Sequence, residues 1–225
     1  AHGVAFLVSS IDVMHLMTLD GITLFFTLVF TAISCFILGM GIPTTAQYII
    51  ASMIAAPALL QWGIHPLVSH MFVLFYAVLA DVTPPVALAA YAASGISGGD
   101  PFKTGFTSFS LSMAKVYVPF VFVYSPIILW LPVLLDPSAS FDYLRFARVF
   151  ITLILGVVAL GATVIGYFRV ESTVLERILT GIAAFCLFTP EGYTDVVGMF
   201  FLIFIIVIQG RRKNKIQKIK ENSNV

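Results

Sequence analysis

The stretch Gly39-Met40-Gly41-Ile42-Pro43-Thr44-Thr45 interrupts a long apolar part of the sequence, between the runs Ile22–Leu38 and Tyr48–Leu60. Glycine permits backbone angles that other residues avoid, and proline is acceptable in the first turn of a helix that follows such a break. A plain membrane span would be uniformly apolar, and this stretch is not. The sequence therefore predicts an interrupted helix at this point.

A second interruption, Asp81-Val82-Thr83-Pro84-Pro85, separates the apolar runs Leu67–Ala80 and Val86–Ala93. The two prolines remove two amide donors and free carbonyl groups one turn earlier in the chain. Asp81 is the only acidic residue between positions 21 and 99. A carboxylate inside a membrane is costly, so it indicates a functional site.

The composition of the whole chain excludes a water-soluble fold. Hydrophobic residues make up 60% of the 225 residues and charged residues 10%, whereas soluble domains have about 45–50% and about 25%. The mean hydropathy is +1.03. The two cysteines lie in apolar runs, and no zinc-ligand spacing or phosphate-binding loop occurs. We predict an all-α membrane protein with several spans.

Beyond the two interruptions, three segments satisfy the length of a simple transmembrane helix: Val116–Leu135, Phe146–Tyr167, and Val196–Gln209 with its preceding turn. The segment Val174–Phe188 is shorter and begins with charged residues, so we expect a span with a charged end. Phenylalanines recur at helical spacing between residues 101 and 115, which predicts an interfacial amphipathic helix.

The basic residues favour one orientation in the membrane. With the predicted helices in order, ten of the 12 Lys and Arg residues fall on one side, and only Arg145 and Arg148 fall on the other. Loops rich in basic residues stay in the cytoplasm, so this side is predicted to be cytoplasmic. The basic tail 211–225 would then be a cytoplasmic, solvated segment that contacts lipid headgroups rather than nucleic acid.

Discontinuous helices at mid-membrane are a common way to build substrate and ion sites. Helix N-termini present amide groups to anions, and carbonyl, hydroxyl and carboxylate oxygens can coordinate Na⁺. Gln47 adds a side-chain amide near the first interruption. The candidate binding residues are Gly39, Gly41, Thr44, Thr45, Asp81, Thr83, Pro84 and Pro85, with Asp81 and Thr83 as possible sodium ligands.

Structural interpretations of these residues stand beside the functional one. Either interruption could be a simple kink, and Asp81 could cap a helix that begins at Pro84. His65 and His70 flank Pro66 and are expected in a loop and at a helix start. A proton relay through either histidine is the weaker hypothesis.

Both interruptions resemble motifs in the large membrane subunit of tripartite ATP-independent periplasmic (TRAP) transporters, and most closely the branch with fused small and large membrane subunits. The resemblance covers nearly the whole chain. It is carried by the stretches 39–45, Ala56-Pro57-Ala58-Leu59, Asp81 to Ala90, Gly95-Ile96-Ser97-Gly98, Asp100-Pro101, Pro119-Phe120 and Val123-Tyr124-Ser125-Pro126.

The resemblance implies a secondary transporter in the bacterial inner membrane that takes up organic anions with a sodium gradient and needs no other cofactor. It implies two partners: a periplasmic substrate-binding protein and a small membrane subunit, which we expect to be fused N-terminally. It also implies an elevator-type transport domain built from inverted repeats. This chain would carry one repeat, with a re-entrant hairpin tip at Gly39–Thr45 and a broken helix at Asp81–Pro85.

One departure from the family pattern concerns sodium. Many members have an aspartate a few residues after the Gly-Met of the tip, where this chain has Pro43 and Thr44. Hydroxyl and carbonyl oxygens would have to replace that carboxylate.

We therefore expect a fragment or C-terminal part of a longer protein, organised in five segments. These are an end of a preceding helix or an interfacial segment (1–20), the transport repeat (21–100), the interfacial helix (101–115), the C-terminal transmembrane helices (116–210) and the basic cytoplasmic tail (211–225).

Other functions fit the sequence less well. Another ion-coupled permease or a channel could also contain broken helices. A membrane-embedded enzyme would need paired carboxylates, a metal motif or a Ser/Lys dyad, and Asp81 stands alone in its region. We expect no enzymatic activity.

Overall fold

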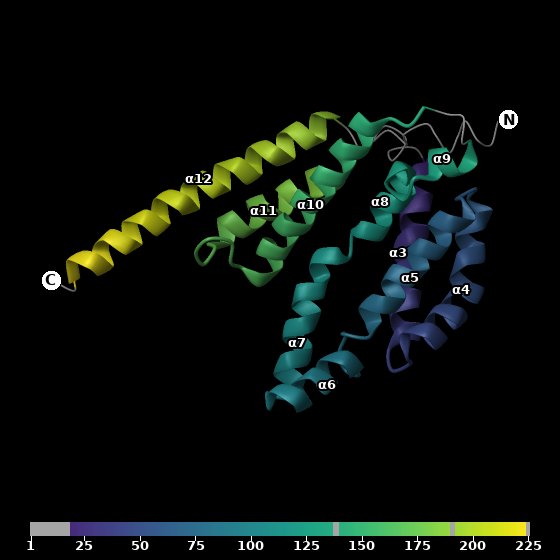
Figure 1. Ribbon diagram of the computed structural model, residues 1–225, viewed down its shortest axis with the longest axis horizontal. Helices are drawn as coiled ribbons and strands as arrows, with labels where there is room; N and C mark the ends of the chain where they lie inside the picture. Colours follow the sequence, from purple (N-terminus) through teal and green to yellow (C-terminus); the bar gives the residue numbers. More distant parts are fainter. Residues whose placement is uncertain (1–18, 137–139, 190–191, 224–225) are drawn as a thin grey trace. The chain divides into compact units, whose positions relative to one another are not determined.

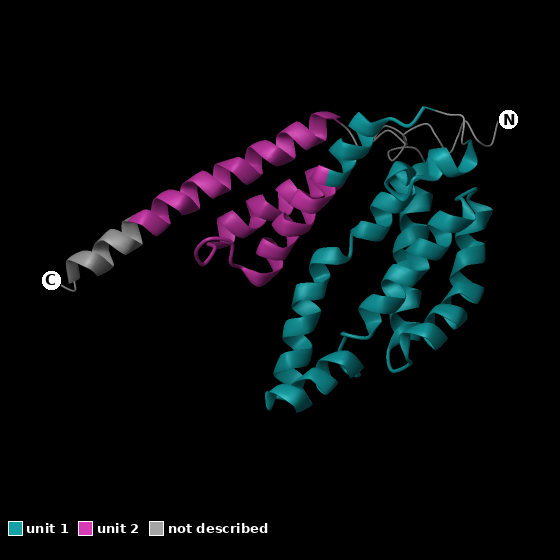
Figure 2. Cartoon of the chain, in the orientation of Figure 1, with its two compact units in different colours: residues 1–150 teal, residues 151–225 magenta. Residues whose placement is uncertain are grey.

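The computed structural model describes residues 19–136, 140–189 and 192–223, and these residues form helices joined by short turns (Figure 1). The predicted segment 1–20 lies almost entirely outside the described residues. Two compact units divide the chain, Ala1–Phe150 and Ile151–Val225 (Figure 2). Each unit is considered separately below.

Unit 1 is built on three helices that pack against one another: α3 (Leu19–Gly39), α4 (Thr44–Gln61) and α5 (Pro66–Ala80). Small side chains such as Cys35, Ala51 and Ala77 are fully buried where the helices approach closely. Phe72 fills the space between α5 and α8 (Val118–Tyr124), with its ring centroid 5.7 Å from that of Phe120. The core of unit 1 is therefore apolar and tightly packed.

The chain after α5 reverses through α6 (Leu88–Ser97) and α7 (Pro101–Ser112), which pack on each other. Asp100 accepts a hydrogen bond from the Lys103 amide at 2.8 Å and so caps α7. Helix α7, the short helix η1 (Met113–Lys115) and α8 together form a stretch that is long and apolar enough to cross a membrane. An interfacial position for residues 101–115 stays a prediction.

The prediction of one simple span at Val116–Leu135 is wrong. This segment divides into α8, a 3₁₀ helix η2 (Pro126–Leu129) and α9 (Leu131–Leu135). Pro126 and Pro132 each lack an amide donor, and the backbone at Trp130 is left-handed, with φ of 57°. Apolar composition alone did not indicate these interruptions.

The remaining helices are α10 (Tyr143–Ile165), which begins in unit 1 and ends in unit 2, α11 (Val174–Phe188) and α12 (Gly192–Ser223). The predicted bounds of α11 agree with the structure. Helix α12 continues through the basic residues to Ser223, so the predicted separate tail is the end of a long helix.

Four helical stretches of the described residues are long and apolar enough to span a membrane: Leu19–Gly39, Pro101–Tyr124, Tyr143–Ile165 and Gly192–Asn214. Large apolar side chains such as Phe30, Ile54 and Phe200 are exposed on the helices. Lipid is the solvent that suits such surfaces. The prediction of an all-α membrane protein is confirmed.

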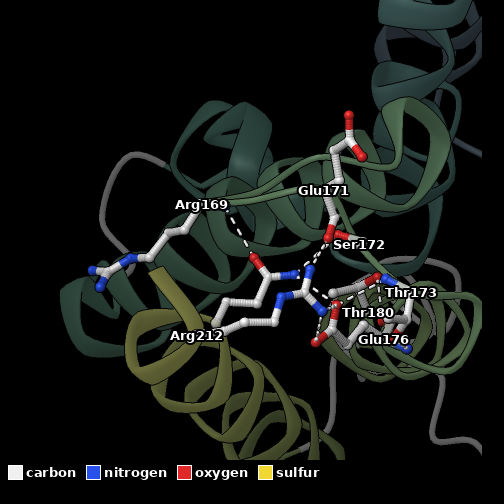
Figure 3. A network of polar contacts seen from close by, with 8 residues as sticks. Arg169, Glu171, Ser172, Thr173, Glu176, Thr180 and Arg212 are labelled. Carbon is white, nitrogen blue, oxygen red and sulfur yellow. Dashed lines mark hydrogen bonds and ion pairs between the residues drawn. The ribbon is translucent and has the colours of Figure 1, made fainter. Parts of the chain in front are cut away.

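A buried carboxylate joins α12 to α11 in unit 2 (Figure 3). Glu176 is 6% exposed and accepts hydrogen bonds from the Thr173 amide at 2.9 Å and the Gln209 side chain at 3.1 Å. Arg212 lies 3.2 Å from the same carboxylate and also donates to the Glu171 carbonyl. Because every bond to Glu176 is charge-assisted, this network fixes α12 on α11.

Removing the cation from this network should destabilise unit 2. Replacing Arg212 with Met leaves the Glu176 charge buried without its ion pair, which costs roughly 2–3 kcal/mol. We expect a lower midpoint of thermal unfolding for the full chain in detergent. The matched control is Arg211→Met, because Arg211 is the exposed neighbour on the same helix. Equal midpoints for the two variants would contradict this account of the network.

The orientation of the chain can be tested with cysteine labelling. If the end of α12 is cytoplasmic, a cysteine at Asn222 should resist membrane-impermeant thiol reagents in intact cells, and one at the exposed Ser140 should react. The unsubstituted chain, with Cys35 and Cys186, measures the background. Labelling at Asn222 but not at Ser140 would reverse the orientation.

Candidate functional site

The first interruption is a tight turn between two helices. Helix α3 ends at Gly39 and α4 begins at Thr44. The backbone amide of Gln47 donates to the Pro43 carbonyl at 3.0 Å. Gly41 has φ of 94°, a left-handed conformation that side chains other than glycine adopt at a cost. Because α3 and α4 pack along each other, the segment forms a helical hairpin with its tip at residues 40–43.

The second interruption separates α5 from α6 by the seven residues 81–87. The Thr83 hydroxyl donates to the Leu79 carbonyl at 2.9 Å, and the Ala87 amide donates to the Thr83 carbonyl at 2.9 Å. The helix that follows starts at Leu88, so the alternative in which Asp81 caps a helix at Pro84 is wrong. Asp81 instead lies at the C-terminal end of α5.

The two interruptions meet in space. The Thr44 hydroxyl donates to the Asp81 carboxylate across 37 residues of sequence. A Cβ atom at Gly39 would lie 2.7 Å from the Ala80 Cβ, and one at Gly41 would lie 3.5 Å from the Val86 side chain. The hairpin tip and the helix break therefore form one site.

Gln47 occupies the centre of this contact. Its side chain is fully buried, and neither atom of its amide has a hydrogen-bond partner among the described residues. The amide lies where a side chain at Gly39 would be, because a Cβ there would be 1.5 Å from the Gln47 Nε2. Burying an amide without partners costs free energy, so a polar group bound at this position would stabilise it.

Helix termini set the electrostatics of the site. The C-terminal ends of α3 and α5 lie at the contact and carry partial negative charge, while the N-terminal end of α4, at Thr44, carries partial positive charge. Asp81 adds a full negative charge at the same place. No Lys or Arg occurs between residues 21 and 102 to balance it. A cation bound at this place would therefore stabilise the Asp81 carboxylate.

Among the predicted site residues, Gly39, Gly41, Thr44 and Asp81 come together at this contact. Thr45 is exposed on α4, and Thr83 is buried with its hydroxyl donated to α5. Pro84 and Pro85 lie in the break itself. Ligand binding by any of these residues stays a prediction.

Gln47 was noted in the sequence but not placed in the predicted binding set. It lies three residues after Thr44, so both side chains occur on one face of α4. A large amide at the start of an otherwise apolar helix was the available signal. No group of three or more His, Cys, Asp or Glu side chains in the described residues could hold a metal ion. A cation here would depend on Asp81 with neutral oxygens.

The fold and site define a class: a multi-pass membrane protein in which a helical hairpin tip contacts a broken helix, as in secondary transporters. Residues 2–135 match the family model of the tripartite ATP-independent periplasmic transporter, DctM component, and the chain belongs to this family. The resemblance drawn from the sequence motifs is thus confirmed. Comparison with curated proteins and with solved structures gave no match.

The close approach at Gly39 can be tested by filling it. Gly39→Ala places a methyl group onto the Gln47 amide and near Ala80, so the hairpin must shift. We expect a destabilisation of about 2 kcal/mol, in the range of overpacked cores, and a loss of transport. Thermal unfolding and uptake of the full-length transporter measure these effects.

The control is Gly95→Ala, because a Cβ at Gly95 meets no atom within 4 Å. The double variant Gly39→Ala with Gln47→Ala should regain part of the stability, because it removes the clash between the new methyl group and the Gln47 side chain. Wild-type stability and uptake in Gly39→Ala would contradict the close packing described here.

Proposed function

We propose that this chain is the permease segment of a sodium-coupled secondary transporter, which takes up organic anions delivered by a periplasmic substrate-binding protein. Membership of the DctM family supports the transporter class. The observation that carries the proposal is the contact between Thr44 at the hairpin tip and Asp81 at the helix break.

The oxygen atoms at this contact suit a sodium ion. Asp81 supplies a carboxylate, Thr44 a hydroxyl, and Gln47 a buried side-chain carbonyl with no other partner in the described residues. Backbone carbonyl groups at the ends of α3 and α5 would supply further oxygens, because each carbonyl oxygen has two lone pairs and can accept more than one bond. These ligands would compensate for the missing aspartate at the tip. Thr83 lies in the same break and is the second predicted sodium ligand.

The anionic substrate would bind at the opposite helix ends. Helices α4 and α6 begin at Thr44 and Leu88, beside the two interruptions, and their first amides lack partners within the helix. A helix N-terminus favours a carboxylate through these amides and its positive dipole end. A cation and an anion bound at neighbouring helix ends would stabilise each other, which is a physical basis for coupled transport.

We also propose the partners and the location of the chain. The family implies a periplasmic binding protein and a small membrane subunit, and we propose that the latter is fused N-terminally. We place the chain in the bacterial inner membrane, with the end of α12 in the cytoplasm. Hairpin and broken helix would move together as part of an elevator-type repeat, because the tip packs on the break.

The charge of Asp81 provides the test of the proposed function. Asp81→Asn keeps the shape of the side chain and its capping ability, but it removes the charge that holds the cation. We expect the variant to insert and fold, while uptake into proteoliposomes falls at least about tenfold or requires much more sodium. The assay contains the full-length transporter, its binding protein and an imposed sodium gradient.

Asp100→Asn is the matched control, because Asp100 undergoes the same chemical change at the exposed cap of α7. It should leave the sodium dependence of uptake unchanged. Wild-type sodium dependence in Asp81→Asn would refute the ionic role of Asp81. Uptake by the wild-type protein without any sodium gradient would refute sodium coupling itself.

A further inference from the structure

The basic residues of unit 2 differ in how they are used. Arg212 is paired with the buried Glu176, and Arg177 donates to the Thr163 and Val164 carbonyls at the end of α10, at 2.9 and 3.1 Å. These two guanidinium groups hold helices together. Three other basic side chains, Arg169, Arg211 and Lys213, are exposed.

Two of these exposed residues, Arg169 and Lys213, lie on one face of α12 and are here named the cationic cluster. The Arg169 guanidinium lies over Gly210 of α12, since a Cβ at Gly210 would be 3.4 Å from its Nη1 atom. Lys213 follows Gly210 by three positions, on the same face of the helix, whereas Arg211 lies on another side. A positive charge from the α10–α11 loop thereby joins one from α12.

No carboxylate among the described side chains lies within ion-pair distance of the cationic cluster. Glu176 is committed to Arg212, and Figure 3 shows the Glu171 carboxylate and the Arg169 guanidinium pointing away from each other. Like charges on one face of a helix repel, so an anion supplied from outside would stabilise the arrangement. The cluster is therefore a place for an anionic ligand.

The position of the cluster identifies the source of that anion. Arg169 follows the apolar helix α10, which ends at Ile165, and precedes α11, which begins at Val174. Arg211 and Lys213 come directly after the apolar part of α12. Three apolar helices therefore have their ends at this level, which corresponds to the headgroup region of a bilayer.

We propose that the cationic cluster of Arg169 and Lys213 binds the phosphate of an acidic phospholipid. The planar Arg169 guanidinium can donate two parallel hydrogen bonds to phosphate oxygens, and Lys213 adds a point charge. Because Gly210 has no side chain, the Arg169 guanidinium can lie against α12. The lipid would connect the α10–α11 loop to α12 on the membrane surface, in addition to the Glu176 network.

The test measures lipid binding to the full chain purified in detergent. Native mass spectrometry follows adducts of phosphatidylglycerol and, separately, phosphatidylcholine. The double variant Arg169→Gln with Lys213→Gln should weaken phosphatidylglycerol binding about 30-fold, because each basic residue near the surface contributes about fivefold. Phosphatidylcholine binding should not change. The substitutions leave the bond from the Arg169 backbone amide to Gln209 intact.

The matched control is Lys103→Gln with Lys115→Gln, which removes two exposed positive charges from unit 1. An equal loss of phosphatidylglycerol binding in both doubles would show a diffuse charge effect and overturn the proposal. So would complete displacement of the lipid by inorganic phosphate at millimolar concentration, which would show a site for free anions.

If the double variant Arg169→Gln with Lys213→Gln does not fold, the single variant Lys213→Gln tests the proposed lipid site. The exposed Lys213 side chain has no described partner, so its replacement should not affect folding. It should weaken binding about fivefold, and unchanged binding would overturn the proposal. This readout involves neither sodium nor substrate. It can therefore fail or succeed independently of the proposed transport function.

Discussion

An apolar solvent constrains the backbone more severely than any side chain in this protein. Amide and carbonyl groups that leave a helix cannot bind water inside a bilayer, so each must find a partner in the protein or in a ligand. In the break between α5 and α6, Thr83 and Ala87 make local bonds that replace the helical ones. At the ends of α3 and α5, the Ile37, Leu79 and Ala80 carbonyls accept hydrogen bonds from the residues that follow each helix. Irregular backbone persists here only as part of a polar site.

The packing of the hairpin follows from the same constraint. A polar site buried between helices needs a close approach of the backbones, and the absence of a side chain at Gly39 provides it. The Gln47 amide fills that space, while the left-handed Gly41 reverses the chain beside Val86. A side chain at Gly39 would separate the tip from the break, and one at Gly41 would strain its left-handed backbone. The glycines thus determine the electrostatic character of the site, although they carry no charge.

Much of this arrangement could be predicted from local sequence. The two interruptions and the bounds of α11 were evident, because proline, glycine and a lone carboxylate are unusual within apolar runs. The role of Gln47 could not be predicted, because the burial of its side chain depends on Gly39 in another helix. The division of Val116–Leu135 into three short helices was also missed, because prolines near helix starts are compatible with a continuous span. Both features depend on contacts between helices, which a local sequence pattern does not predict.

The protein contains two carboxylates at helix junctions, and their surroundings differ in an instructive way. Glu176 receives an arginine, a glutamine side chain and a backbone amide, so its charge is balanced within the protein. Asp81 receives a hydrogen bond from the Thr44 hydroxyl and lies beside two negative helix ends. A balanced carboxylate fixes helices permanently. A carboxylate without an arginine or lysine partner would gain further stabilisation when a cation arrives, so the strength of the tip–break contact would depend on ion binding. That dependence is what a coupled transporter requires of its moving parts, because a contact that was equally stable with and without the ion could not respond to the gradient.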